Sequence, residues 1–143
     1  MPETILKGHK VSKGKAKGEA LVSRAPISFM GGVNPETGII IDKGHELEGA
    51  SVTDKILVFP VGKGSTSGSY QLYTLVHFGK APKGIINRRA DSVVAIGAII
   101  GDIPMMDRLE QDPLEIIKTG DLVEIDADQG IVKVMSKSSA GSI

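Results

Sequence analysis

Residues 59–78 read FPVGKGSTSGSYQLYTLVHF, and this stretch decides the fold that we expect for the chain. The run at 55–59, apolar after its first residue Lys55, leads into it and is short and β-branched enough to be a buried strand. From Tyr70 to Phe78, apolar residues recur at helical spacing. The sequence therefore predicts a strand, a glycine-rich turn and a helix, in that order.

The turn between the strand and the helix is rich in glycine and in hydroxyl side chains. The hydroxyls crowd the place where a first helical turn leaves backbone N–H groups unpaired. They belong to Ser65, Thr66, Ser67 and Ser69. Because glycine allows a close approach of the backbone and a helix N-terminus is partly positive, we interpret the turn as an anion or oxyanion site with an activated hydroxyl. The alternative is that one serine only caps the helix and the glycines only shape the bend.

The spacing of the turn excludes two better-known sites. It does not match the nucleotide-binding P-loop, because the lysine precedes the serines and none follows the second glycine. It also does not match the nucleophile elbow of hydrolases.

Composition narrows the function further. The chain has 143 residues, 17 Lys and Arg against 17 Asp and Glu, and no Cys. A formally neutral chain gives no case for nucleic acid or a polyanionic surface. Without cysteine, the chain supplies no disulfide and no thiolate for zinc or an iron–sulfur cluster. No stretch approaches the ~18 apolar residues of a membrane helix, and no leader-like segment opens the chain, so we expect a cytoplasmic protein.

Residues 24–49 form the longest irregular stretch and are expected to be a loop with short extended pieces. Loops of this length inside a compact domain are often functional. A glycine pair beside Phe29 would let the backbone approach a ligand closely. Ser28, Gly31 and Gly32 are therefore candidate substrate-binding residues. The alternative is a surface excursion that apolar side chains hold in place.

The rest of the chain is interpreted mostly as strands. Residues 4–23 predict a hairpin with a lysine-rich edge. Residues 84–86 and 92–100 have the apolar texture of central strands or of a buried segment. Residues 120–126 and 131–135 alternate around a glycine turn and predict a second hairpin. Strands thus outnumber helices, and we expect an α+β, β-rich fold whose closed or sandwiched β core carries the helix after the glycine-serine turn.

Two adjacent arginines, Arg88 and Arg89, follow the strand expected at 84–86. They are either solvated, or they clamp a carboxylate or phosphate through paired hydrogen bonds. Arg88 is therefore a further candidate substrate-binding residue. The three histidines lie far apart in unlike contexts, so no metal site is expected on this chain.

Several motifs, in the same order and over nearly the whole chain, resemble the small subunit, or swivelling β/β/α domain, of the aconitase X family. They lie at 18–23, 26–33, 35–38 with Asp42 and His45, and above all 60–69. Met30 stands where the family has an aromatic residue, and Asn34 where it has an aspartate. The resemblance implies a single swivelling domain over residues 1–136, followed by a flexible tail at 137–143.

The resemblance also implies a function. Archaeal family members of this size pair, as heterodimers, with a large subunit that carries an iron–sulfur cluster. They act as a hydro-lyase that removes water from (R)-5-phosphomevalonate, giving trans-anhydromevalonate 5-phosphate in a variant mevalonate route to isoprenoids. One alternative is a subunit of a cis-3-hydroxy-L-proline dehydratase or another aconitase-like hydro-lyase. The other is a non-catalytic swivelling interaction domain. Neither nucleic acid nor a membrane is an expected partner.

By resemblance to the Gly-x-Gly-Ser turn of aconitase, Ser65 is the expected catalytic base. A hydroxyl is a poor base near neutral pH, so its oxyanion would need backbone amides and the helix end around it. The residues expected to form that cradle are Gly64, Thr66 and Ser67. Aconitase has a substrate-binding arginine two positions after its serine, where this chain has Ser67. The missing charge is expected from Arg88, Arg89 or the large subunit.

Overall fold

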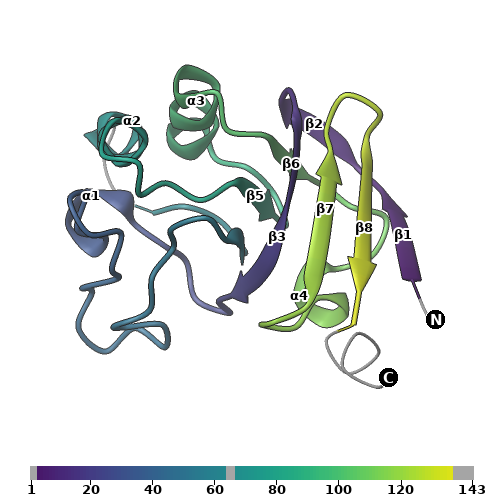
Figure 1. The fold of residues 1–143 in the computed structure, drawn as a ribbon, viewed down its shortest axis with the longest axis horizontal. Helices are drawn as coiled ribbons and strands as arrows, with labels where there is room; N and C mark the ends of the chain where they lie inside the picture. The colour runs from purple at the N-terminus through teal and green to yellow at the C-terminus, as the bar shows by residue number, and fades with distance from the viewer. Residues whose placement is uncertain (1–2, 64–66, 137–143) are drawn as a thin grey trace.

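The computed structural model describes residues 3–63 and 67–136 and contains an eight-stranded sheet with three of the helices packed on one side and the fourth beside the last two strands (Figure 1). The strands are β1 (Glu3–Lys7), β2 (His9–Ser12), β3 (Lys15–Val22), β4 (Ile56–Phe59), β5 (Gly84–Asn87), β6 (Met105–Asp107), β7 (Leu122–Asp126) and β8 (Ile131–Met135). The helices are α1 (Phe29–Gly32), α2 (Ser67–His77), α3 (Ser92–Gly101) and α4 (Pro113–Ile116). Gly64, Ser65, Thr66 and the tail expected at 137–143 lie outside the described residues.

The two strands at the ends of the sheet, β1 and β2, are consecutive in the chain, so the sheet is strongly curled. The strand order is β1-β8-β7-β3-β4-β5-β6-β2, and only Gly8 separates β1 from β2. β3 joins the two halves, since residues 15–19 pair antiparallel with β7 and residues 20–22 pair parallel with β4. One bent segment, residues 3–12, therefore closes the β core: its first strand, β1, pairs with β8, and its second strand, β2, pairs with β6.

The hairpin predicted at 4–23 is wrong in its pairing, although all its strands form. In the described part of the chain, β1 pairs with β8, β2 with β6, and β3 with β7 and β4. Gly8 makes the bend, where a Cβ atom would collide with the side chain of Leu109. Alternating apolar residues indicate strands but do not name their partners, which explains the error.

Neighbouring residues of the parallel strands face two different cores. Leu57 and Phe59 of β4 pack with α2, α3 and the long loop. Ile56 and Val58 pack against β7, β8 and α4. Because side chains alternate across a strand and both faces are covered, the run after Lys55, at 56–59, reads as continuously apolar. The result is a β/β/α arrangement of three layers, as the fold class predicted.

Residues 92–100, whose texture suited a central strand, form helix α3 instead, so the strand interpretation is wrong. β5 and β6 are parallel neighbours, and such strands require a crossover connection between them. Asp91 caps the start of α3, and Asp102 ends it with a left-handed φ of 59°. A Cβ at Gly97 would lie 3.1 Å from Leu72 Cβ, which shows how closely α2 and α3 pack.

The remaining predicted elements are confirmed. The run at 55–59 contains β4, the helical spacing after the glycine turn corresponds to α2, and the C-terminal hairpin is β7–β8. Residues 24–49 are mostly irregular and contain only the short α1 and isolated bridges. Within the described ranges, no helix combines the length and apolar character needed to cross a membrane.

Candidate active site

The glycine-serine turn follows the carboxyl end of β4, at the edge where the parallel strands β3, β4, β5 and β6 all end. Ligands of α/β sheets bind beyond the carboxyl ends of such strands. Every arginine in the sequence comes directly after one of these strand ends or one residue later. They are Arg24, Arg88, Arg89 and Arg108. This edge therefore combines the turn with the guanidinium groups of the chain.

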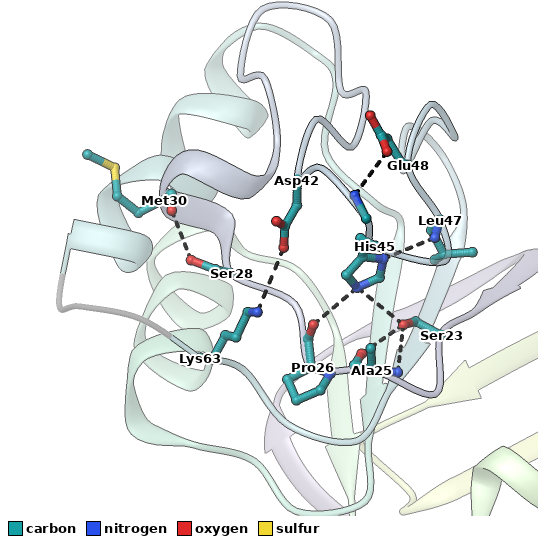
Figure 2. Close-up of polar contacts among 11 residues, drawn as sticks. Ser23, Ala25, Pro26, Ser28, Met30, Asp42, His45, Leu47, Glu48 and Lys63 are labelled. Carbon is teal, nitrogen blue, oxygen red and sulfur yellow. Dashed lines mark hydrogen bonds and ion pairs between the residues drawn. The ribbon is translucent and has the colours of Figure 1, made fainter.

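The long loop is hydrogen-bonded to the residues that enter the turn. The amide of Ile27 donates to the carbonyl of Val61 at 3.4 Å, and the amide of Lys63 donates to the carbonyl of Ile27 at 3.1 Å. The Lys63 ammonium lies 3.8 Å from a carboxylate oxygen of Asp42 (Figure 2). The backbone pairing and this ion pair bring residues 27–42 to the turn.

Ser28, Gly31 and Gly32 lie in the part of the loop that starts beside the turn. The hydroxyl of Ser28 donates to the carbonyl of Met30 at 2.9 Å (Figure 2). Gly31 has a φ of 84°, and no atom lies within 4 Å of where its Cβ would be. Phe29 is buried and meets the ring of Phe59 edge-on at 6.1 Å. The buried Phe29 therefore holds the loop in place, and the exposed Gly31 leaves its backbone open to a ligand. The structure is compatible both with a structural role and with a substrate-binding role of this loop.

Ser23 and His45 lie together in the same loop but do not form a nucleophile–base pair (Figure 2). His45 Nδ1 accepts the amide of Leu47 at 3.0 Å, so the ring proton is on Nε2, which lies 3.1 Å from the carbonyl of Pro26. Ser23 Oγ donates to the carbonyl of Ala25 at 2.7 Å. Since Nε2 carries a proton, His45 cannot take one from Ser23. The pair fastens the loop.

The residues before and after the turn are also hydrogen-bonded to the start of α3, through Asp91 and Ser69. Asp91 Oδ1 accepts the amide of Gly62 at 3.1 Å, and its Oδ2 accepts the amides of Val93 and Val94 at 3.1 and 3.4 Å. Ser69 is buried in α2, and its hydroxyl donates to the carbonyl of Val93 at 2.6 Å. The residues on both sides of 64–66 are therefore bonded to the N-terminus of α3.

Sequence reasoning missed Asp91. Aspartate before an apolar run is an N-cap signal, but it is informative only if the run is a helix. Because residues 92–100 were interpreted as a strand or buried segment, the signal was not used.

Arg88 is engaged by an acidic partner. Its Nε and Nη2 donate to Oδ1 and Oδ2 of Asp112, each at 2.9 Å. The hydrogen bond from Arg88 lowers the pKa of Asp112 below its usual value, helped by the amide of Leu114 and opposed by partial burial. The pKa of Arg88 is raised by the same bond. Asp112 therefore occupies one side of this guanidinium, and the N–H groups of Nη1 are not used by that pair.

Arg89 differs from its neighbour. Its backbone amide approaches the carbonyl of Pro60 at 3.4 Å, which places it beside the segment that enters the turn. Its side chain is exposed, and among the described residues no carboxylate forms an ion pair with it. Among the described residues of this edge, Arg89 is therefore the arginine whose side chain has no ion-pair partner.

The remaining candidates are only partly located. Ser67 is the exposed first residue of α2, directly after the turn. Gly64, Ser65 and Thr66 lie outside the described residues, so their roles stay predictions. In the described ranges, no three His, Asp or Glu side chains gather as a metal site, and the sequence has no cysteine. These residues do not fit an iron–sulfur cluster.

Comparison with known proteins gives consistent matches. Residues 5–134 match the family model of the aconitase X swivel domain. The chain is 54% identical over 129 residues to a phosphomevalonate dehydratase small subunit of Methanocella arvoryzae, covering 90% of this chain and 98% of the relative. For the protein of that name in Thermococcus kodakarensis the identity is 54% over 130 residues, covering 91% and 96%. A crystal structure of Thermococcus kodakaraensis aconitase X in its holo-form matches with a TM-score of 0.88 and 52% identity, covering 93% and 99%.

Proposed function

The chain belongs to the aconitase X swivel domain family, and on that premise we propose that it is the small subunit of a hydro-lyase acting on (R)-5-phosphomevalonate. The product is trans-anhydromevalonate 5-phosphate. The observation that carries the proposal is the 54% identity to phosphomevalonate dehydratase small subunits over nearly the full length of both chains.

The partner is a large subunit, as the name of these relatives implies. We place the iron–sulfur cluster on that subunit, because this sequence contains no cysteine. When bound there, the cluster supplies the Lewis acid that loss of hydroxide requires. Dehydration also requires a base that removes a proton from the neighbouring carbon, and this chain contributes that base.

Ser65 is the residue that we assign to proton removal. Two features of the described residues support it. The turn lies at the ligand-binding edge of the parallel strands, and α2 begins at Ser67 directly after it, so the partly positive helix end stabilises an oxyanion there. Backbone and hydroxyl donors at Gly64, Thr66 and Ser67 complete the cradle in this proposal.

The substrate carries a carboxylate and a phosphate, and guanidinium groups bind both anions through paired hydrogen bonds. Both side chains are exposed, but Arg88 is paired with Asp112, whereas Arg89 has no ion-pair partner among the described residues. Arg89 therefore supplies the charge more readily. Ser28 and the exposed Gly31 complete the substrate-facing edge, because their loop is bonded to the entrance of the turn. Gly32 is buried, and its carbonyl accepts the amide of Ile41 at 2.9 Å, so it contributes by holding this loop.

Co-expression with a cluster-bearing large subunit tests the proposal. The anaerobically purified complex should convert (R)-5-phosphomevalonate to the anhydro product, detected by mass spectrometry. The chain purified by itself should be colourless, folded and inactive. Turnover by the chain without a partner, or a complex that dehydrates cis-3-hydroxy-L-proline and leaves phosphomevalonate unchanged, would contradict it.

A further inference from the structure

We propose that Asp91 is a positioning residue for the dehydration, because its carboxylate fixes the glycine-serine turn to the N-terminus of α3. The inference rests on the proposed function of the turn. Asp91 Oδ1 accepts the amide of Gly62, which lies 29 positions earlier in the chain, at 3.1 Å. A helix cap needs only one side-chain oxygen, and Oδ2 already fulfils that role for Val93 and Val94. Oδ1 therefore serves the turn.

The fit around Gly62 shows that this contact is built tightly. A Cβ atom at Gly62 would lie 2.5 Å from Asp91 Oδ1 and 2.5 Å from Val94 Cγ2. Real Cβ atoms do not approach other atoms so closely, so only glycine leaves the amide free to meet the carboxylate. The entrance of the turn and the first turn of α3 are thus shaped for each other.

Ser69 makes the matching contact after the turn. Its hydroxyl donates to the carbonyl of Val93 at 2.6 Å, and the side chain is buried. Gly62 before the turn and Ser69 after it are therefore bonded to the same short segment, residues 91–93. This fixes the separation and orientation of the two ends between which Ser65 is placed. An error of about 1 Å in the position of a reacting group can cost on the order of 100-fold in rate.

The substitution Asp91→Ser separates positioning from capping. Serine is as good an N-cap as aspartate, so α3 keeps its start. Its single, shorter oxygen cannot also reach the amide of Gly62. The matched control is Ala95→Gly, which weakens α3 one turn later but leaves both contacts with the turn in place.

Two measurements are made on each variant. In the full-length chain alone, amide exchange of Gly62 should accelerate by about tenfold or more in Asp91→Ser and stay near the wild-type rate in Ala95→Gly. In the complex with the large subunit, Asp91→Ser should lower kcat about 10- to 100-fold with little change in KM, because binding groups are untouched. Ser69→Ala should likewise lower kcat with little change in KM.

The proposal is overturned if the Gly62 amide exchanges at the wild-type rate in Asp91→Ser, or if that amide is freed and kcat remains unchanged. It is also overturned if Ala95→Gly lowers kcat as much as Asp91→Ser, since helix stability would then explain both. The exchange measurement needs no catalysis, so it reports on Asp91 independently of whether Ser65 is the base.

Discussion

Arg88 and Asp112 face each other with two parallel hydrogen bonds, Nε to Oδ1 and Nη2 to Oδ2, each 2.9 Å long. The pair joins the end of β5 to the start of α4, because Asp112 also accepts the amide of Leu114 at 3.1 Å. The two side chains remain 46% and 35% exposed. Solvent therefore screens the pair, and its contribution to stability is expected to be small.

The first prediction is an acid dependence that originates from this pair. Since the folded state lowers the pKa of Asp112 below 3.8, the pair stabilises the fold above that value, and the contribution disappears as the pH falls through the lowered pKa. Urea midpoints of the wild type and Arg88→Gln should therefore differ at neutral pH and converge at acidic pH. A constant difference across the whole range would show that the ion pair does not contribute.

The second prediction concerns the two neighbouring arginines. Arg89→Gln should raise KM for (R)-5-phosphomevalonate about 10- to 100-fold, the cost of losing a charge-assisted hydrogen bond worth about 1.5–3 kcal/mol. Steady-state kinetics of the assembled complex provide the measurement. Arg108→Gln, which removes a guanidinium from the same edge, is the control for net charge. If Arg88→Gln raises KM and Arg89→Gln does not, the role belongs to Arg88.

The third prediction concerns the packing of Gly62. Gly62→Ala should destabilise the chain by about 1–3 kcal/mol, because the new methyl group collides with Asp91 and Val94. Gly44→Ala is the matched control, since no atom lies within 4 Å of its Cβ position and only its φ of 83° adds strain. Denaturant unfolding measures both variants. Loss of activity should accompany Gly62→Ala alone, and full activity in that variant would contradict the close fit.

The fourth prediction concerns the long loop. If residues 28–33 face the cleft shared with the large subunit, their amides should gain hydrogen-exchange protection when that subunit is added. Gly31 is the most informative probe in this segment, because it is exposed in the chain alone. Protection confined to β7 and β8, with none at 28–33, would leave the loop with a structural role only.

The parts of the fold that sequence predicted are those governed by local pattern. Three elements are indicated by their local sequence alone. They are β4 in the run at 55–59, α2 in the helical spacing from Tyr70, and the β7–β8 hairpin around its glycine turn. The partners of β1 and β2 are not predictable in this way, because β1 pairs with β8 and β2 with β6, and both partners lie far along the chain. The local pattern of the isoleucine-rich α3 does not distinguish a helix from a strand either, since it is the parallel order of β5 and β6 that requires the helix.

The site was predictable to a similar extent. Glycine and hydroxyl residues identify the turn, because their chemistry is visible in the sequence. The groups that hold the turn come from far along the chain, and nothing in their local pattern connects them with it. Asp91 and Asp42 are the examples, bonded to Gly62 and Lys63 respectively. Likewise, only the structure distinguishes Arg88, which is paired with Asp112, from Arg89, which has no ion-pair partner among the described residues.

The central claim is that Ser65 is the base, and Ser65→Ala tests it most directly. The substitution removes one hydroxyl, so its cost in stability should stay within about 1 kcal/mol. Ser67→Ala, two positions later at the start of α2, serves as the control for loss of a hydroxyl that caps or donates a hydrogen bond and is not the base.

The decisive measurement is kcat for (R)-5-phosphomevalonate at matched concentrations of intact complex. We expect Ser65→Ala to lose about 10²- to 10⁴-fold in kcat, the usual cost of removing a positioned base. Ser67→Ala removes one hydrogen-bond donor and leaves the base in place, so it should lower kcat less than Ser65→Ala does. If Ser65→Ala keeps more than about a tenth of the wild-type kcat, less than the loss of a general base entails, Ser65 is not the base and the turn serves binding or capping.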